Sequence, residues 1–228
     1  MWDNFIQIAG VKNLEEAKML ISKGVRFIGF PLRLTVNAED TTEAEAREII
    51  AKIKHNSSPV LITYLSRANE IIEFCNYLDV KLIQLHGNIE VEELVKLKQR
   101  ANNIKVIKSL VVKKNNLSEL EKIVLDTQDY VDAYITDTYD PITGAEGATG
   151  KTHDWEISKH LISLIKKPVI LAGGLNADNV FSAIVEVKPA GVDSHTGVEN
   201  SDGDKDPEKV EAFVNNALRA FNQIRQRR

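Results

Sequence analysis

The feature that most constrains the fold of this chain is a regular alternation between short apolar runs and longer amphipathic segments. The short runs are rich in β-branched residues, which favours strands, and apolar residues recur with helical spacing in the longer segments. The expected strands are residues 5–9, 26–30, 60–65, 80–85, 104–111, 130–136, 168–171 and 191–194. The expected helices are residues 14–24, 41–55, 67–78, 90–101, 117–127, 154–166, 177–187 and 207–224. This alternation is typical of repeated βα units and a parallel sheet.

Eight βα units in 228 residues predict an α/β fold, a single (β/α)8 TIM barrel that spans residues 1–228 as one domain. No proline-rich, serine-rich or glycine-rich stretch is present to serve as a linker. The rival architecture is an open doubly wound sheet, but its G-x-G-x-x-G fingerprint is missing after the first strand, where the chain reads Ile8-Ala-Gly-Val-Lys. The pair Asn13 and Glu16 resembles a capping box at a helix start, which agrees with the barrel.

Composition and charge narrow the function classes. Hydrophobic residues make up 43% and charged residues 27%, which is ordinary for a globular protein and argues against disorder or a membrane protein. A net charge of -4 with evenly spread basic residues argues against nucleic acid as a partner. The start, Met1-Trp-Asp-Asn, lacks signal-peptide regions, so a cytoplasmic location is expected. Cys75 is the only cysteine and is expected to be a small buried hydrophobe.

Polar residues at the carboxyl ends of the expected strands are the candidates for chemistry, because the active site of such a barrel lies on that face. If Ile6 and Ile8 pack on the helices, strand alternation predicts which residues point into the barrel. These inward residues are Phe5, Gln7, Ala9, Gln84, His86, Ile135, Asp137, Asp193 and His195. The polar members form either a binding site at one rim or a hydrogen-bonded polar plug that closes the barrel.

Two glycine-containing turns follow the last two expected strands, Leu171-Ala-Gly-Gly-Leu-Asn and Ser194-His-Thr-Gly-Val-Glu. Barrels often bind phosphate between these two loops, where backbone amides converge on the anion. The expected ligand is therefore a small phosphorylated molecule. The expected phosphate-binding residues are Gly173, Gly174, Thr196 and Gly197. The loop after strand six, residues 138–153, is long and glycine-rich, which is typical of a lid.

Several motifs together resemble the phosphoribosylanthranilate isomerase family of tryptophan biosynthesis. They occur in the family's order between residues 5 and 206. The motifs are Gln84-Leu-His-Gly, Asp137-Thr, Gly147-Ala-Thr-Gly-Lys-Thr-His-Asp-Trp, Leu171-Ala-Gly-Gly-Leu, and Val192-Asp with Gly197-Val-Glu. The resemblance implies an Amadori rearrangement that converts an aminoaldose, phosphoribosylanthranilate, to an aminoketose without cofactor or metal.

Such a reaction needs an acid to open the sugar ring and a base to remove the proton from C2 of the resulting Schiff base. By the resemblance, Asp137 is the acid, and its carboxyl has to stay protonated. Arg33 is the nearest equivalent of the arginine that holds the anthranilate carboxylate in the family. Gln84 and Asp193 are expected to bind substrate, and His86 is a further catalytic candidate.

The chain departs from the family at the base. The first strand of the family ends K-I-C-G, with the cysteine as base, whereas this chain reads Gln7-Ile-Ala-Gly and places Ala9 there. His195 stands where the family has a serine, and it either serves as a substitute base or hydrogen-bonds Asp193 or a loop carbonyl. The loop after strand two is also shorter than in the family, which affects the role of Arg33.

Two classes of function remain open from sequence. One is a phosphoribosylanthranilate-type isomerase, favoured by Asp137, the lid and both turns; the other is a catalytically silent barrel that binds a sugar phosphate, favoured by Ala9. A metal held by the histidines and aspartates of the rim matches no zinc spacing, so none is expected. The chain is expected to be a monomer or a homodimer.

Overall fold

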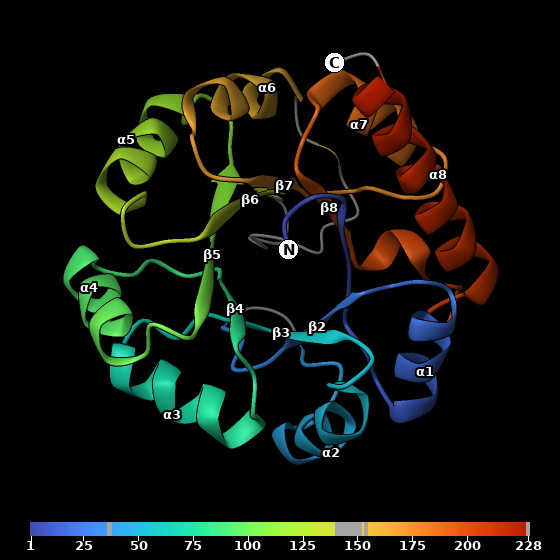
Figure 1. Ribbon diagram of the computed structural model, residues 1–228, viewed down its shortest axis with the longest axis horizontal. Coiled ribbons are helices and arrows are strands. Elements are labelled where there is room, and N and C mark those ends of the chain that lie inside the picture. Colours follow the sequence, from blue (N-terminus) through green and yellow to red (C-terminus); the bar gives the residue numbers. More distant parts are fainter. Residues whose placement is uncertain (36–37, 140–151, 153–154, 227–228) are drawn as a thin grey trace.

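The computed structural model describes residues 1–35, 38–139, 152 and 155–226. Eight parallel strands close into a barrel in sequence order, with β8 paired to β1, and helices surround it (Figure 1). The strands are β1 (Phe5–Ala9), β2 (Phe27–Pro31), β3 (Ser58–Thr63), β4 (Leu82–Leu85), β5 (Lys105–Val112), β6 (Ala133–Thr138), β7 (Val169–Leu171) and β8 (Gly191–Ser194). The predicted (β/α)8 barrel is thereby confirmed.

The outer layer contains eight α-helices among the described residues. They are α1 (Leu14–Ser22), α2 (Glu43–Ile53), α3 (Ala68–Leu78), α4 (Val91–Arg100), α5 (Leu117–Thr127), α6 (Trp155–Leu164), α7 (Val180–Val187) and α8 (Pro207–Gln226). Each overlaps an expected helix, and the ends differ by a few residues. The largest difference is at α7, which begins at Val180 because Asn176 and Asn179 first form a side-chain-bonded turn. Within the described ranges, no helix combines the length and the apolarity needed to cross a membrane.

Strand alternation divides the apolar core into two layers, as expected. Ile6 and Ile8 pack outward against the helices, while Phe5 and Ala9 belong to a separate cluster inside the barrel. At the amino-terminal end of the barrel the ring of Phe5 stacks on that of Phe27, with ring centroids 3.9 Å apart. This end is therefore closed by apolar side chains, which leaves the polar inward residues to the carboxyl end of the strands.

Local hydrogen bonds fix the loops at that end. Asn13 caps α1 by accepting from the backbone N–H of Glu16. The Glu16 carboxylate does not close a reciprocal capping box; instead it accepts from the backbone N–H groups of Lys12 and Lys205. One buried carboxylate thus ties the loop after β1 to the loop that precedes α8, and both loops border the carboxyl ends of β1 and β8.

Candidate active site

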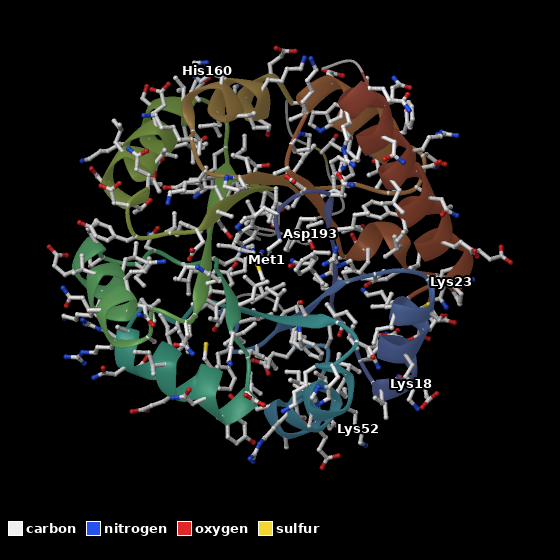
Figure 2. The ribbon with its side chains drawn as sticks, viewed as in Figure 1. Met1, Lys18, Lys23, Lys52, His160 and Asp193 are labelled. Atoms are coloured by element: carbon white, nitrogen blue, oxygen red, sulfur yellow. The ribbon has the colours of Figure 1, made fainter. Side chains whose placement is uncertain are left out.

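The carboxyl ends of the strands enclose a cavity of about 120 Å³. Five residues predicted for the site line it together: Gln84, His86, Asp137, Asp193 and His195. The remaining lining residues are Ala9, Pro31, Leu34, Ala38, Ile62 and Tyr64. Figure 2 shows Asp193 inside the ring of strands and His160 on the outer helical layer, where it pairs with Glu121. The strands therefore gather ionisable side chains at one rim, against an apolar wall.

A row of polar contacts crosses the barrel, and three of its four residues line this cavity. Gln7 Nε2 donates to Gln84 Oε1 at 2.9 Å, and Gln84 Nε2 lies 2.6 Å from His86 Nε2. His86 Nε2 lies 4.0 Å from Asp137 Oδ2. Among the described residues, Gln7 Oε1 and Asp193 Oδ1 are buried without a hydrogen-bond partner. These two oxygens are acceptors available to a bound molecule that donates hydrogen bonds.

Asp137 lies at the end of β6 and is buried. Burial raises the pKa of Asp137 to about 8; the charge of Asp193 adds to the rise, and a hydrogen bond from the backbone N–H of Thr138 to Oδ1 opposes it. A carboxyl with this pKa is largely protonated at neutral pH. It can therefore donate a proton to a bound molecule, which an ordinary aspartate cannot do.

Asp193 at β8 is the second buried carboxyl of the cavity. Burial raises the pKa of Asp193 to about 6, while a hydrogen bond from Gln7 and electrostatic interactions with His195 and Lys205 limit the rise. The pKa of Asp193 thus lies below that of Asp137. Near pH 7 the cavity therefore holds one largely protonated carboxyl and one largely ionised carboxyl. In acid–base catalysis the first kind of group donates a proton and the second kind accepts one.

The two glycine turns converge as the sequence predicted. Gly173, Gly174, Thr196 and Gly197 line a small hollow of about 20 Å³ that also borders Asp137, Asp193 and His195. The turns touch closely: a Cβ added at Gly197 would meet the carbonyl oxygen of Leu175, which also accepts a hydrogen bond from Ser194 Oγ at 2.7 Å. Two turns that meet after the last two strands of a barrel lie where such folds often bind phosphate.

Arg33 does not reach the cavity. Its guanidinium pairs with Glu43 at 2.8 Å and lies 3.8 Å from the ring centroid of Phe74. The hydrogen bond to Glu43 raises the pKa of Arg33 above its ordinary value. Arg33 therefore does not line the cavity, because its side chain is engaged by Glu43 on α2 and Phe74 on α3. Its contact with a ligand carboxylate stays a prediction.

Cys75 does not line the cavity. Cys75 is buried on α3 in the outer core, and burial raises its pKa to about 12, so it remains a thiol near neutral pH. The lid expected at residues 138–153 lies outside the described residues apart from Thr138, Tyr139 and Thr152. No group of three or more histidine, cysteine, aspartate or glutamate side chains in the described part of the chain is arranged to hold a metal ion.

Sequence reasoning missed two carboxylates beside His195. Asp40 Oδ1 and Glu199 Oε1 each lie 3.5 Å from His195 Nε2. Asp40 comes from the loop after β2, and Glu199 follows the short 3-10 helix Thr196–Val198 after β8. Glu199 is the last residue of the Gly197-Val-Glu motif, but that motif assigns it no role beside a histidine. Neither Asp40 nor Glu199 lies on a strand, where parity would predict the direction of the side chain.

Comparison with known proteins agrees with this geometry. The family described as "N-(5'phosphoribosyl)anthranilate (PRA) isomerase" matches residues 6–216. N-(5'-phosphoribosyl)anthranilate isomerase 2 of Methanosarcina mazei is 36% identical over 221 residues, which is 96% of each chain. The isomerase of Methanococcus aeolicus is 37% identical over 93% of this chain and 97% of its own.

Solved structures show the same likeness. The phosphoribosyl anthranilate isomerase of Thermotoga maritima superimposes with a TM-score of 0.79 at 27% identity, covering 94% of this chain and 98% of its own. The isomerase of Pyrococcus furiosus gives a TM-score of 0.74 at 30% identity, covering 95% and 99%. The match extends over nearly the whole barrel in both comparisons. This chain therefore belongs to the N-(5'-phosphoribosyl)anthranilate isomerase family.

Proposed function

We propose that this protein is a phosphoribosylanthranilate isomerase, an aldose–ketose isomerase of tryptophan biosynthesis. One observation carries the proposal beyond family membership: Asp137, a buried carboxyl with a pKa of about 8, stands between the cavity and the hollow of the two glycine turns. A sugar phosphate anchored in the hollow extends its ring past this group. Asp137 is then placed to protonate the ring oxygen.

The acid step is ring opening. The Asp137 carboxyl donates its proton to the ring oxygen as the bond between that oxygen and C1 breaks. The lone pair on the anthranilate nitrogen forms the C1=N bond, which gives an N-protonated Schiff base and a free hydroxyl group. Gln84 and Asp193, which line the same cavity, are assigned to hold the sugar hydroxyls. The unpartnered Oδ1 of Asp193 is an acceptor for one of them.

The phosphate is assigned to the backbone amides of Gly173, Gly174, Thr196 and Gly197. No lysine is needed for this, because amides at a turn and at the start of a short helix are aimed at the anion. The hollow borders Asp137 and Asp193, so the phosphate end and the reacting end of one small molecule are both accommodated.

A solved phosphoribosyl anthranilate isomerase in complex with reduced 1-(o-carboxyphenylamino)-1-deoxyribulose 5-phosphate superimposes with a TM-score of 0.76 at 25% identity. It covers 94% of this chain. We expect this chain to accept a ligand of the same kind as its small phosphorylated substrate. We also expect it to act in the cytoplasm as a monomer or homodimer; the isomerase of Thermotoga maritima is described as dimeric, with monomers generated from it.

The competing function is a silent barrel that binds a sugar phosphate, and Ala9 favours it because a methyl group cannot accept a proton. The deciding assay supplies phosphoribosylanthranilate to the purified protein and follows loss of its fluorescence. Because substrate and product are isomers, NMR should identify the product by the C1 methylene of the aminoketose. We expect turnover that is absent with Asp137→Asn. Binding of inorganic phosphate without turnover in the wild type would favour the silent barrel.

A further inference from the structure

Ala9 and His195 are neighbours across the seam where the barrel closes. β1 and β8 pair through Gln7 with Asp193 and Ile8 with Ser194, so the next step of the register sets Ala9 beside His195. Both side chains line the cavity. The imidazole extends over Gly10, since a Cβ added there would lie 2.0 Å from Nε2. A small residue at position 9 and a glycine at position 10 together make room for the ring.

Two carboxylates hold that ring from the side. Asp40 and Glu199 both stand 3.5 Å from Nε2, and all three side chains are largely buried, with 15–20% exposed. The wholly buried Lys205 ammonium fixes Glu199 at 2.5 Å and donates to the backbone carbonyl of His195 at 3.3 Å. Glu16 in turn holds the backbone N–H of Lys205. The ring is therefore positioned by a connected set of charged groups.

The charges around the ring determine which nitrogen is available. The groups that face it are the carboxylates of Asp40, Glu199 and Asp193 and the ammonium of Lys205. Burial raises the pKa of Asp40, but the hydrogen bond and charge of His195, with Lys205 and Lys12, bring it below its ordinary value. Two ionised carboxylates at Nε2 favour a proton on that nitrogen. Nδ1, which has no hydrogen bond within the described part of the chain, then remains as an acceptor.

We infer that His195, positioned by Asp40 and Glu199, is the base that removes the C2 proton in place of the cysteine expected at position 9. The inference rests on the proposed isomerase function. The imidazole accepts the proton from C2 of the N-protonated Schiff base. The electron pair of that C–H bond becomes the C1=C2 bond, and the electron pair of C1=N moves to nitrogen. The enol that results becomes the ketone when its O–H proton is lost and C1 is protonated.

The kinetic test compares the wild type with His195→Asn on phosphoribosylanthranilate. His160→Asn is the matched control, because His160 also pairs with a glutamate but lies on α6 far from the cavity. We expect kcat to fall about a hundred-fold or more in His195→Asn, with a KM change of only a few-fold, and neither to change in the control. Adding Ala9→Cys to His195→Asn should restore turnover, which a collapsed site would not do.

The positioning role of the carboxylates is read from kinetics and from NMR. In Asp40→Asn and in Glu199→Gln we expect kcat to fall while KM changes only a few-fold, because the ring is no longer held in place. Nitrogen NMR of the His195 ring, assigned by its loss in His195→Asn, should show the proton on Nε2 in the wild type. A larger Nδ1-protonated fraction should appear in Asp40→Asn. These ring signals do not depend on turnover.

The outcomes separate the two claims. An active wild type whose turnover survives His195→Asn overturns the inference and leaves the isomerase assignment intact. An inactive wild type that becomes active on Ala9→Cys also overturns it, since the site then lacks a base. If neither the wild type nor Ala9→Cys is active, the proposed function itself fails. A proton on Nδ1 in the wild type contradicts the positioning by Asp40 and Glu199.

Discussion

The cavity has two halves that differ in how they relate to the family pattern. In the half around Asp137, called here the acid half, Gln84, His86 and Asp193 line the same cavity, and all four residues are ones that the sequence singled out. In the base half, formed by the end of β1 and the loop after β2, the base position is a methyl group at Ala9, and Arg33 is turned away to Glu43.

On the proposed roles, one half of the site keeps the family pattern while the other half is rebuilt from neighbouring elements. Asp40 enters the base half from the loop after β2, and His195 enters from β8. The pKa of Asp137 is raised by burial, and that burial depends on many residues around the carboxyl ends of the strands. A base needs only a positioned acceptor within reach, which an adjacent strand can supply.

The largest expected effect comes from removing the acid. Asp137→Asn should lower kcat by about a thousand-fold or more, because the ring oxygen then leaves without a proton. The asparagine side chain still accepts the backbone N–H of Thr138, so the fold should be preserved. Stopped assays at high protein concentration measure the residual rate. Turnover within ten-fold of the wild type would mean that the acid half does not supply the acid.

The same substitution has a pH-dependent effect on stability. In the unfolded chain Asp137 ionises near its ordinary value, whereas in the folded chain its pKa is about 8. Between these values the unfolded state loses the proton first, so the wild type loses stability as pH rises toward 8. Asp137→Asn should therefore gain stability over the wild type, by about 2 kcal/mol or more at pH 9 relative to pH 4. A difference in the free energy of unfolding that is constant with pH would contradict the burial argument.

A smaller effect is expected at the hollow that both halves share. Gly197→Ala places a methyl group against the carbonyl oxygen of Leu175 and forces the two turns apart. We expect the Kd for inorganic phosphate, measured by calorimetry, to rise about ten-fold, because the amides are no longer aligned on the anion. Gly203→Ala is the control, because it replaces a glycine in a turn that does not line the cavity. Equal phosphate affinity in wild type and Gly197→Ala would remove the hollow as the phosphate site.

The smallest effect is expected at Arg33. Since its guanidinium is engaged by Glu43 and Phe74, Arg33→Met should leave KM within about two-fold. It should cost about 1 kcal/mol of stability through the lost stacking and ion pair. Arg47→Met is the matched control, because the Arg47 guanidinium likewise lies over an aromatic ring of α3, that of Tyr77. A ten-fold rise in KM specific to Arg33→Met would show that the side chain turns into the cavity when substrate binds.

The positions of Gln84, Asp137 and Asp193 could be predicted from sequence because these residues lie on strands. Parity determines that Gln84 and Asp137 point inward, and the closed register determines that they meet at one rim. Apolar alternation likewise predicted all eight strands. Helix starts were less certain, as at α7, where side-chain hydrogen bonds of Asn176 delay the helix.

The base half could not be predicted in the same way because loop side chains follow contacts that are distant in sequence. Arg33 is oriented by Glu43 and by Phe74, on two different helices. Asp40 is placed beside a histidine that follows it by more than half the chain. Neither contact leaves a periodic trace in the sequence. For Arg33 a family resemblance was the only guide, and its side chain lies outside the lining of the cavity.

The most direct test of a conserved acid and a replaced base is a crystal structure of this chain with reduced 1-(o-carboxyphenylamino)-1-deoxyribulose 5-phosphate. We predict that the phosphate binds the amides of Gly174 and Gly197. The hydroxyl derived from the ring oxygen should lie within hydrogen-bond distance of Asp137, and C2 should lie closer to His195 than to any other ionisable side chain. A complex in which C2 faces His86 or solvent, or in which Asp137 makes no contact with that hydroxyl, would contradict this division of the site.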